Sequence, residues 1–401
     1  MPKQSILINQ LALEWAQAQE MNRFAQQLVQ TPSFSGHEGA LATLLVEHLR
    51  ELGFPDVRVN EMGSVIVTLG NGNGPTLLYN AHMDTVSAAT EPWEHSPFEG
   101  VSEGGKLHGL GAVDMKGALA AMVYGARQLL SFQDQLNGRL VLAFVVQQEP
   151  CEGLAMRVLV EEDGIRPDFV LLGEPTNLQI SRGQRGRVMF KVQVQGRSSH
   201  GSQPDLGQNA IYAAARLVFA VQLMADDLLH DPFLGPGTIA VTGIESHGAS
   251  LNAIPDLCKV YLDRRLTLGE TVTGAQAQLE SMISREGIPA TVQITTYDDP
   301  SYTGLVRMAR EAHPAWVLER SHPLVTGLAT TIQAACGTTP DIVHWPFSTD
   351  GVYTMGQANI PTVGFGPGDP NLAHTSQEAV WLDDLKQAAH VYAGLAATLL
   401  D

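Results

Sequence analysis

The chain has 401 residues, of which 44% are hydrophobic and 16% are charged. This length predicts two or three domains, and the composition is that of an ordinary globular protein, which excludes intrinsic disorder. Acidic residues outnumber basic ones by 42 to 24, and the net charge of −18 argues against binding to nucleic acid or to anionic membrane surfaces. No apolar run approaches the roughly 18–20 residues that a membrane-spanning helix needs.

Two features of the sequence predict a cytoplasmic location. The first ten residues, MPKQSILINQ, lack a basic segment followed by an apolar one, so we expect no secretory signal. Cys151, Cys258 and Cys336 form no pattern typical of a disulfide framework, which fits a reducing compartment.

Helical and strand-like patterns alternate over the first part of the chain. In chain order they predict helices over 8–30 and 37–53, strands over 57–69 and 76–81, a helix over 115–130, and strands over 140–146 and 169–172. The strand over 140–146 is continuously apolar, which is typical of a parallel strand buried between helices on both faces. The alternation therefore predicts an α/β domain with a mostly parallel sheet between helices.

The pattern changes near residue 187, where apolar and polar residues begin to alternate, as in a sheet with one solvated face. This strand over 188–194 is followed by a helix over 209–225, strands over 238–241 and 257–262, a helix over 271–285 and a strand over 290–297. The order of these elements predicts an inserted α+β domain of ferredoxin-like topology over 187–299. The α/β pattern then returns with a strand over 362–365 and a closing helix from residue 382, so 1–186 and 300–401 together form the first domain.

Residue types that bind metal ions follow four of the apolar strands closely. They are His82, with Asp84 two residues later, Glu149, Glu174 and His374, and Asp114 stands just ahead of the helix over 115–130. Taken singly, such residues are usually exposed to solvent, and Asp114 alone could be the N-cap of the helix that follows it. Because sites in open α/β sheets gather at the carboxyl ends of the strands, we expect these side chains to converge at one edge.

Four motifs of the chain resemble those of the M20 family of metallo-amidohydrolases, which includes acetylornithine deacetylase, succinyl-diaminopimelate desuccinylase, the glutamate-releasing carboxypeptidase and bacterial dipeptidases. In chain order they are His82-Met83-Asp84-Thr85-Val86, Gly111-Ala112-Val113-Asp114-Met115-Lys116-Gly117, Gly173-Glu174-Pro175-Thr176 and Gly196-Arg197-Ser198-Ser199-His200-Gly201-Ser202-Gln203-Pro204. The resemblance extends over essentially the whole chain.

The resemblance implies a zinc-peptidase catalytic domain with two zinc ions per subunit, for which cobalt or manganese could substitute. Their ligands would be Asp114, which bridges the ions, His82 and Glu174 on one ion, and Glu149 and His374 on the other. Asp84 would orient the ring of His82 through its second nitrogen. Such a metal pair implies hydrolysis of an amide bond by metal-activated water.

The resemblance also implies that the inserted domain is a lid that carries the contact of a homodimer. His200 would reach the partner's active site and stabilise the tetrahedral oxyanion, although a polar residue in a Gly/Ser loop is usually only solvated. Asn252 and Arg265 would hold the free carboxylate of the substrate, because arginine presents a planar fork of donors. Arg264 is the weaker match to this arginine, and the alternative for Arg265 is a surface ion pair with Asp263.

One catalytic position departs from the family pattern. The residue before Glu149 corresponds to a glutamate that serves as the general base, and here it is Gln148. An amide cannot take up and return a proton, and losing a general base costs ~10²–10⁴ in rate. Three explanations are open: an engineered change that stops turnover, a natural homologue that binds without cleaving, or another carboxylate, such as Glu152, that acts as the base. The isosteric change and the otherwise intact motifs favour the first.

The sequence thus predicts a di-metal amidohydrolase that cleaves an N-acyl amino acid or a small peptide with a free carboxylate, with activity reduced by Gln148. The rival from another class is a catalytically silent homologue that captures a peptide or an acyl amino acid. A second rival is a monomeric aminopeptidase without a lid contact, and the long helix over 209–225 argues against it.

Overall fold

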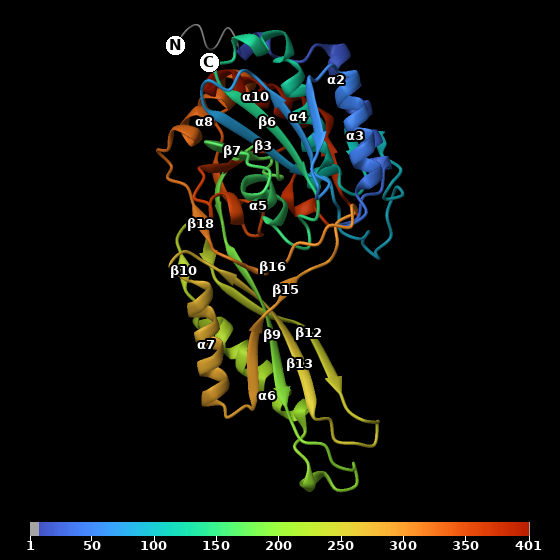
Figure 1. Cartoon of the computed structure of the whole chain (residues 1–401), viewed down its shortest axis with the longest axis vertical. Coiled ribbons are helices and arrows are strands. Elements are labelled where there is room, and N and C mark those ends of the chain that lie inside the picture. Colours follow the sequence, from blue (N-terminus) through green and yellow to red (C-terminus); the bar gives the residue numbers. More distant parts are fainter. Residues whose placement is uncertain (1–7, 401) are drawn as a thin grey trace.

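The computed structural model describes residues 8–400. The prediction that the chain has no secretory signal concerned the first ten residues, most of which lie outside the described residues. Figure 1 shows a long molecule with two parts, of which one carries a large sheet and most helices and the other extends from it. Within the described residues, no helix is both long and apolar enough to cross a membrane.

The large sheet has nine strands, and the four in its middle run parallel. Its main path is β1 (Asp56–Val59), β2 (Val65–Leu69), β6 (Arg139–Val145), β3 (Thr76–His82), β7 (Phe169–Leu172), β20 (Thr362–Gly364), β8 (Ile180–Gln184) and β18 (Trp316–Val317), with β19 (Ile342–Trp345) paired to β8. Antiparallel neighbours flank the parallel centre on both sides. The predicted α/β class with a parallel central sheet is confirmed.

Helices cover this sheet because its central strands are apolar on both faces, and β3 and β6 are buried along nearly their whole lengths. The long helices are α2 (Trp15–Gln30), α3 (Gly39–Glu51), α4 (Gly117–Arg127), α8 (Pro323–Cys336) and α10 (Leu382–Leu399). Helix α4 packs against α2 and α10, α3 packs against β1 and β2, and α8 packs against α10. The short α5 (Leu154–Glu161) and α9 (Gly351–Thr354) pack against each other.

The second part is an antiparallel five-stranded sheet, four strands of which form its main path, with two helices and a hydrophobic core of its own. The sheet order is β12 (Thr238–His247), β13 (Leu257–Leu266), β9 (Gly186–Gln195) and β14 (Ala290–Ile294), and the helices are α6 (Ala210–Met224) and α7 (Val272–Arg285). This is the predicted ferredoxin-like order. The buried residues Val188, Phe190, Val192 and Val194 alternate with less buried ones along β9, as the sequence pattern predicts.

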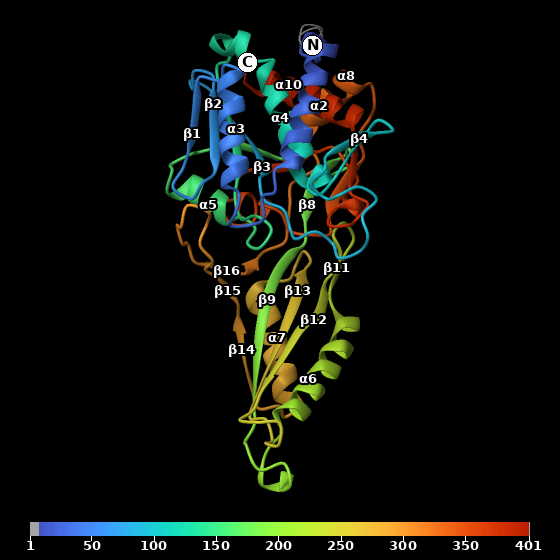
Figure 2. The ribbon, with the colours of Figure 1, turned by 90° about the vertical axis from the view of Figure 1, so that its right-hand side faces the viewer.

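The chain passes between the two parts twice (Figures 1 and 2). It runs directly from β8 into β9, and it returns through β15 (Thr296–Tyr297) and β16 (Ala309–Arg310), which pair with each other. The short β17 (Ala312–His313) then adds to the edge of β9 beside the large sheet's domain.

Four predicted elements differ in the structure. The strand over 290–297 is divided, since β14 pairs with β9 and β15 pairs with β16. The strand over 57–69 is the hairpin β1–β2, because Asn60 Oδ1 accepts hydrogen bonds from the backbone N–H groups of Gly63 and Ser64 and closes a turn. The first long helix begins at Trp15. The chain is not helical over residues 11–14, where Leu11 and Leu13 are both buried although they are only two residues apart. Helix α4 begins at Gly117, because the backbone around Asp114 leaves the helical region.

A glycine in the large sheet tests how tightly the core beneath the metal-ligand edge is packed. A Cβ atom on Gly364 would overlap the buried ring of Trp345, whose Nε1 donates to the backbone oxygen of Pro175 at 2.9 Å. We expect Gly364→Ala to lower the free energy of unfolding by about 1–3 kcal/mol, as overpacking does. The control, Gly327→Ala on α8, meets no atom within 4 Å and should be neutral or stabilising in urea denaturation. Equal effects of the two substitutions would contradict the packing argument.

Candidate metal centre

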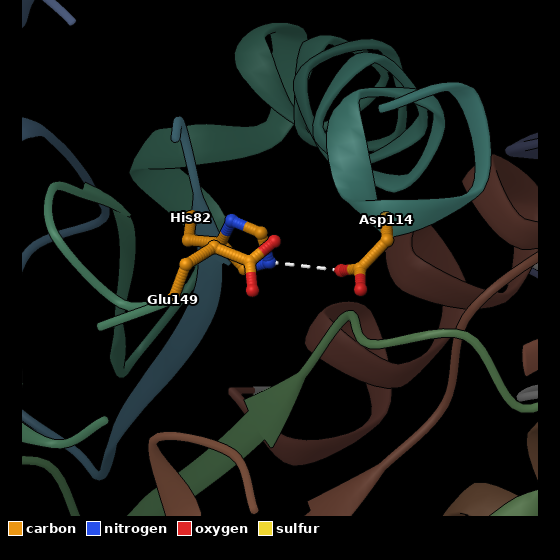
Figure 3. Close-up of side chains that lie close together, drawn as sticks. All are labelled: His82, Asp114 and Glu149. Carbon is orange, nitrogen blue, oxygen red and sulfur yellow. Dashed lines mark hydrogen bonds and ion pairs between the residues drawn. The ribbon is translucent and has the colours of Figure 1, made fainter. Parts of the chain in front are cut away.

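Three side chains from distant parts of the sequence meet at the carboxyl edge of the parallel strands. His82 ends β3, Asp114 precedes α4 and Glu149 follows β6, and each offers a ligand atom within 4.8 Å of the other two (Figure 3). The strands bring them together because β3 and β6 are parallel neighbours, with His82 paired in register to Val145. The predicted convergence of these three residues is therefore present in the structure.

The imidazole of His82 is fixed from both sides. Its Nδ1 lies 2.8 Å from the backbone oxygen of Asp84, and its Nε2 lies 2.9 Å from Oδ1 of Asp114. The carbonyl can only accept, so the proton belongs on Nδ1, and Nε2 is left as the ligand atom. The carboxylate of Asp84, which the family resemblance implied as the orienting group, lies farther away, at 3.6 Å from Nδ1.

His374 completes the cluster on its open side. Its Nε2 lies 3.2 Å from Oδ2 of Asp114 and 3.1 Å from Oε1 of Glu149, and its side chain is 47% exposed. Asp114 thus uses one oxygen toward His82 and the other toward His374. A carboxylate with a histidine at each oxygen has the arrangement that a ligand bridging two ions requires.

Glu174, which follows β7, is the fifth predicted ligand and is almost fully buried. Its Oε1 accepts a hydrogen bond from the side-chain Nε2 of Gln148 at 3.1 Å. Gln148 is 5% exposed and lies in the same cavity as Asp114 and Glu149. The residue at the predicted base position therefore lies beside the ligands, with its amide nitrogen turned to a carboxylate.

The charges of this cluster call for a cation. Burial and the nearby Asp114 carboxylate raise the pKa of Glu174 well above its usual value. Hydrogen bonds to Asp114 and Glu149 raise the pKa of His374 to about 10. Burial lowers the pKa of His82, but Asp114 and the neighbouring carboxylates raise it well above normal. The distances of 2.9–3.2 Å between the histidine nitrogens and the carboxylate oxygens also fit pairs of ligand atoms that bind the same ion, each about 2 Å from it. The set of nitrogen and oxygen donors suits zinc, cobalt or manganese.

Asp84 braces the segment that carries Gln148 and Glu149. Its Oδ1 accepts from the backbone N–H of Gln148 and its Oδ2 from that of Glu149, both at 3.1 Å. Its Oδ2 also accepts from the hydroxyl of Ser35 at 2.7 Å. These three donors explain why the carboxylate is turned away from His82. Ser35, which lies between the predicted helices over 8–30 and 37–53, was not among the predicted site residues.

A second buried carboxylate, Glu38, holds the same segment from the other side. Its Oε1 accepts from the backbone N–H groups of Gly36 and Gln147, at 3.1 and 3.0 Å. Gln147 has a φ of 55° and directs its side chain to the hydroxyl of Tyr297 at 2.7 Å, away from Gln148. No sequence signal pointed to Glu38, because its partner at the site, Gln147, lies 109 residues away in the chain.

Four of the five predicted ligands, Asp114, Glu149, Glu174 and His374, line a cavity of about 370 Å³. Its wall from the second part of the molecule contains Arg187 and Arg265, so the predicted carboxylate-binding Arg265 does face the ligands. Arg265 also pairs with Asp263, through Nε at 2.7 Å and Nη2 at 3.0 Å, so the ion pair weighed as its alternative is present as well. Glu152 lies in the cavity too, but its Oε1 is bound by Arg187 at 2.9 Å. The weaker match, Arg264, is buried and paired with Glu270.

Two predicted residues lie far from this cavity. His200 and Asn252 belong to the loops that follow β9 and β12, at the end of the second part remote from the large sheet (Figure 1). The strand from Arg187, at the cavity, to Gln195 alone spans about 25 Å. The two exposed residues lie close to each other, since the backbone N–H of Gly201 donates to the oxygen of Asn252 at 2.6 Å. Within one chain, the structure does not bring them to the metal ligands.

The chain is similar to a known peptidase family and to curated proteins over most of its length. The chain matches the peptidase family M20/M25/M40 over residues 78–398, so this protein belongs to the M20 family. It is 37% identical to the Escherichia coli K12 protein YgeY over 385 residues, which cover 95% of this chain and 94% of YgeY. It is 28% identical to acetylornithine deacetylase of Vibrio atlanticus over 88% of this chain and 89% of that enzyme.

Solved structures share the fold over nearly the whole chain. An M20 family metallo-carboxypeptidase from Sulfolobus solfataricus has a TM-score of 0.73 at 17% identity and covers 94% of this chain and 98% of its own. The Bacillus subtilis YXEP protein, described as a dinuclear metal binding peptidase of the M20 family, has a TM-score of 0.70 at 16% identity, with coverages of 97% and 99%. At these identities the likeness shows the fold alone.

The carboxylate of Glu38 gives a pH-dependent prediction. Burial, with a smaller effect of Asp84, raises its pKa from 4.5 to about 7. Between these values the folded protein retains a proton that the unfolded chain releases, so stability falls as the pH rises through this window. Urea unfolding at pH 5, 6 and 8 should show that the parent loses stability relative to Glu38→Gln as the pH increases. Glu47→Gln, on the exposed side of α3, should follow the parent. A pH dependence unchanged in Glu38→Gln would refute the assignment.

Proposed function

We propose that this protein is a metal-dependent amidohydrolase that cleaves the amide bond of an N-acyl amino acid or a small peptide with a free carboxylate. The observation that carries the proposal is the placement of four predicted ligands and Arg265 around one small cavity, with the fifth predicted ligand, His82, 2.9 Å from Asp114. A cavity of about 370 Å³ suits a small molecule. The names of the curated relatives, which include acetylornithine deacetylase and succinyl-diaminopimelate desuccinylase, support the same class of reaction.

The proposed cofactor is a pair of zinc ions, for which cobalt or manganese can substitute. The ligands would be Asp114 between the ions, His82 and Glu174 on one, and Glu149 and His374 on the other. When bound, such a pair polarises the scissile carbonyl and makes water nucleophilic near neutral pH. Asp84, by holding the backbone of residues 148 and 149, keeps one ligand and the base position at a fixed distance from Asp114.

Arg265 would bind the free carboxylate of the substrate. Asp263 occupies its Nε and Nη2, while its Nη1 has only Ser348 Oγ at 3.3 Å. The Nη1 side of the guanidinium is therefore available to a carboxylate in the cavity. This contact fixes the position of the amide bond relative to the ligands, and correct positioning lowers the barrier to attack.

Gln148 would hydrogen-bond the reacting groups but cannot carry a proton between the nucleophile and the leaving nitrogen. Glu152 is a poor substitute, because Arg187 binds its Oε1 and its Oε2 is buried. We therefore keep the hypothesis that Gln148 impairs turnover, and that an engineered, isosteric exchange is its origin. The rival function is capture of a peptide or an acyl amino acid without cleavage.

The exchange Gln148→Glu tests both hypotheses. In the zinc- or cobalt-loaded protein it should raise the rate of amine release from N-acetyl amino acids, N-succinyl amino acids or dipeptides by about 10²–10⁴. Gln147→Glu is the matched control, because that side chain contacts Tyr297 rather than the ligands, and it should not raise the rate. Removal of the metal with a chelator should abolish the gain.

The other outcomes separate the alternatives. Equal turnover by the parent and Gln148→Glu would mean that a different group serves as the base. Metal binding and substrate binding without turnover in either protein would favour the silent homologue.

We further propose that residues 187–299 form the lid and that two lids associate in a homodimer. Helix α6 exposes Tyr212, Phe219 and Leu223 along one side, with 74%, 67% and 72% of their surfaces accessible. The neighbouring strand β12 is an edge of the lid sheet and leaves one row of backbone groups unpaired. A second copy would cover these surfaces and could supply His200 and Asn252 to the cavity, which one chain cannot do.

Sedimentation should give the mass of a dimer for the parent and that of a monomer for Leu223→Asp, since the charge would have to be buried at the interface. A second measurement tests whether each chain supplies its His200 to the cavity of the partner chain. A mixture of Gln148→Glu/His200→Ala and Gln148→Glu/Asp114→Asn chains, refolded together, should recover activity that neither has alone. A monomeric parent, or no recovery in a mixed dimer, would exclude the shared site.

The cytoplasmic location stays a prediction from the sequence. The three cysteines are free, in keeping with a reducing compartment.

A further inference from the structure

Arg187 and Arg265 lie directly opposite each other on neighbouring lid strands. They are paired residues in the antiparallel register of β9 and β13, so their side chains project from the same face of the sheet. Like charges in such a pair are destabilising, and no pairing requirement of the sheet calls for arginine at either position. Both side chains line the cavity that holds the metal ligands. This placement points to an anion as the group that they serve.

Two carboxylates hold the two arginine side chains in place but leave some of the guanidinium N–H donors unbound. Asp263 lies between them, bound by Arg265 at 2.7 and 3.0 Å and by Nε of Arg187 at 3.3 Å. Glu152 accepts from Nη1 of Arg187 at 2.9 Å. Within residues 8–400, Nη2 of Arg187 has no hydrogen-bond acceptor, and its side chain is 18% exposed. Each guanidinium is thus fixed in orientation and retains a free donor.

The neighbouring carboxylate does not offer a site for a cation instead. Oε1 of Glu152 is engaged by Arg187, and its Oε2 is buried and lies 3.8 Å from Nε2 of His313. Oε1 is therefore engaged, and Oε2, although it has no hydrogen-bond partner in the described part of the chain, has almost no accessible surface for an ammonium group in the cavity. The accessible unused donors of this wall belong to the two arginines.

We propose that Arg187 is a specificity-determining residue that selects substrates with a second carboxylate, so that the preferred substrates are N-acyl derivatives of aspartate or glutamate. One carboxylate binds Arg265 and the other binds Arg187, and the amide bond between acyl group and amino acid lies against the ligands on the opposite wall. The short carbon chain that separates the two carboxylates in these amino acids suits two guanidinium groups on directly opposed residues. The inference rests on the proposed function, since it places the same substrate in the same cavity.

Binding to the zinc-loaded chain, with Gln148 retained to prevent turnover, is the direct test. Calorimetry compares N-acetylglutamate with N-acetylglutamine, which has the same shape and lacks one charge, and with N-acetyllysine, which carries the opposite charge. We expect the acid to bind at least about tenfold more tightly than the amide, as a charged hydrogen bond allows, and the lysine derivative to bind most weakly. In Arg187→Gln, the ratio of the affinities for acid and amide should fall to about one.

Arg185→Gln is the matched control, because Arg185 lies two residues away with the same charge but bonds to the backbone oxygens of Pro346 and Pro236. It should keep the preference for the acid. If Arg187→Gln does not fold, because Glu152 loses its buried partner, the charge-neutral pair Arg187→Gln/Glu152→Gln takes its place with the same expected loss of preference. A preference that survives in these variants, equal binding of acid and amide by the parent, or no binding of any probe would overturn the proposal.

The proposed function and this assignment can fail separately. Selective binding of the acid with no amine release in Gln148→Glu would sink the amidohydrolase proposal and leave Arg187 as the residue that selects the ligand. Hydrolysis of acidic and neutral N-acetyl amino acids by Gln148→Glu at equal kcat/KM would keep the enzyme and remove the role of Arg187.

Discussion

The constraint on which the site depends is the repulsion between carboxylates gathered in a buried place. Asp114, Glu149 and Glu174 lie together at the edge of the sheet, with His82 and His374 among them. Ionised carboxylates in a medium of low polarity repel strongly unless positive charge lies between them. Burial and the Asp114 carboxylate raise the pKa of Glu174, and hydrogen bonds to Asp114 and Glu149 raise the pKa of His374. A proton on either group reduces the repulsion among the neighbouring carboxylates. The proposed pair of divalent ions would meet the need for positive charge and would also supply the chemistry that we propose.

Hydrogen bonds to the backbone convert this crowded cluster into a defined geometry. The carboxylate of Asp84 holds residues 148 and 149, and that of Glu38 holds residue 147. Asp350 in turn binds Nδ2 of Asn80 on β3 at 2.8 Å and the backbone N–H of Gly153 at 2.7 Å, ahead of α5. The segment between β6 and α5 is thus held at three points by buried carboxylates. Ligands carried by such a fixed segment need little reorganisation when a metal ion or substrate binds.

The candidate site residues of the lid form two groups, which lie at opposite ends of its long strands. At one end of β9 and β13, Arg187 and Arg265 face the metal ligands of their own chain. At the other end, the loops with His200 and Asn252 face away from them. One chain therefore contains a cavity with the predicted ligands and a wall with two arginines, and the proposed dimer would add the groups that the chain's own lid cannot deliver.

Much of the fold was predictable because it follows from local patterns. The continuous apolar run of β6, the alternation along β9 and the helical spacing of α6 and α10 each place hydrophobic residues where burial requires them. Boundaries were less predictable where a side chain rather than a periodicity ends an element. The turn closed by Asn60 splits one expected strand into two, and the backbone around Asp114 delays the start of α4.

The sequence by itself determined the types of ligand, their positions after the strands and the departure at Gln148, because these are properties of residues and of their order along the chain. Only the tertiary structure decided which groups are neighbours. It paired Glu38 with a residue 109 positions away, turned Asp84 from His82 to the backbone of its neighbours, and set Arg187 opposite Arg265 beside the ligands. Sheet register and side-chain direction produce these contacts, and neither is encoded in any local stretch of sequence.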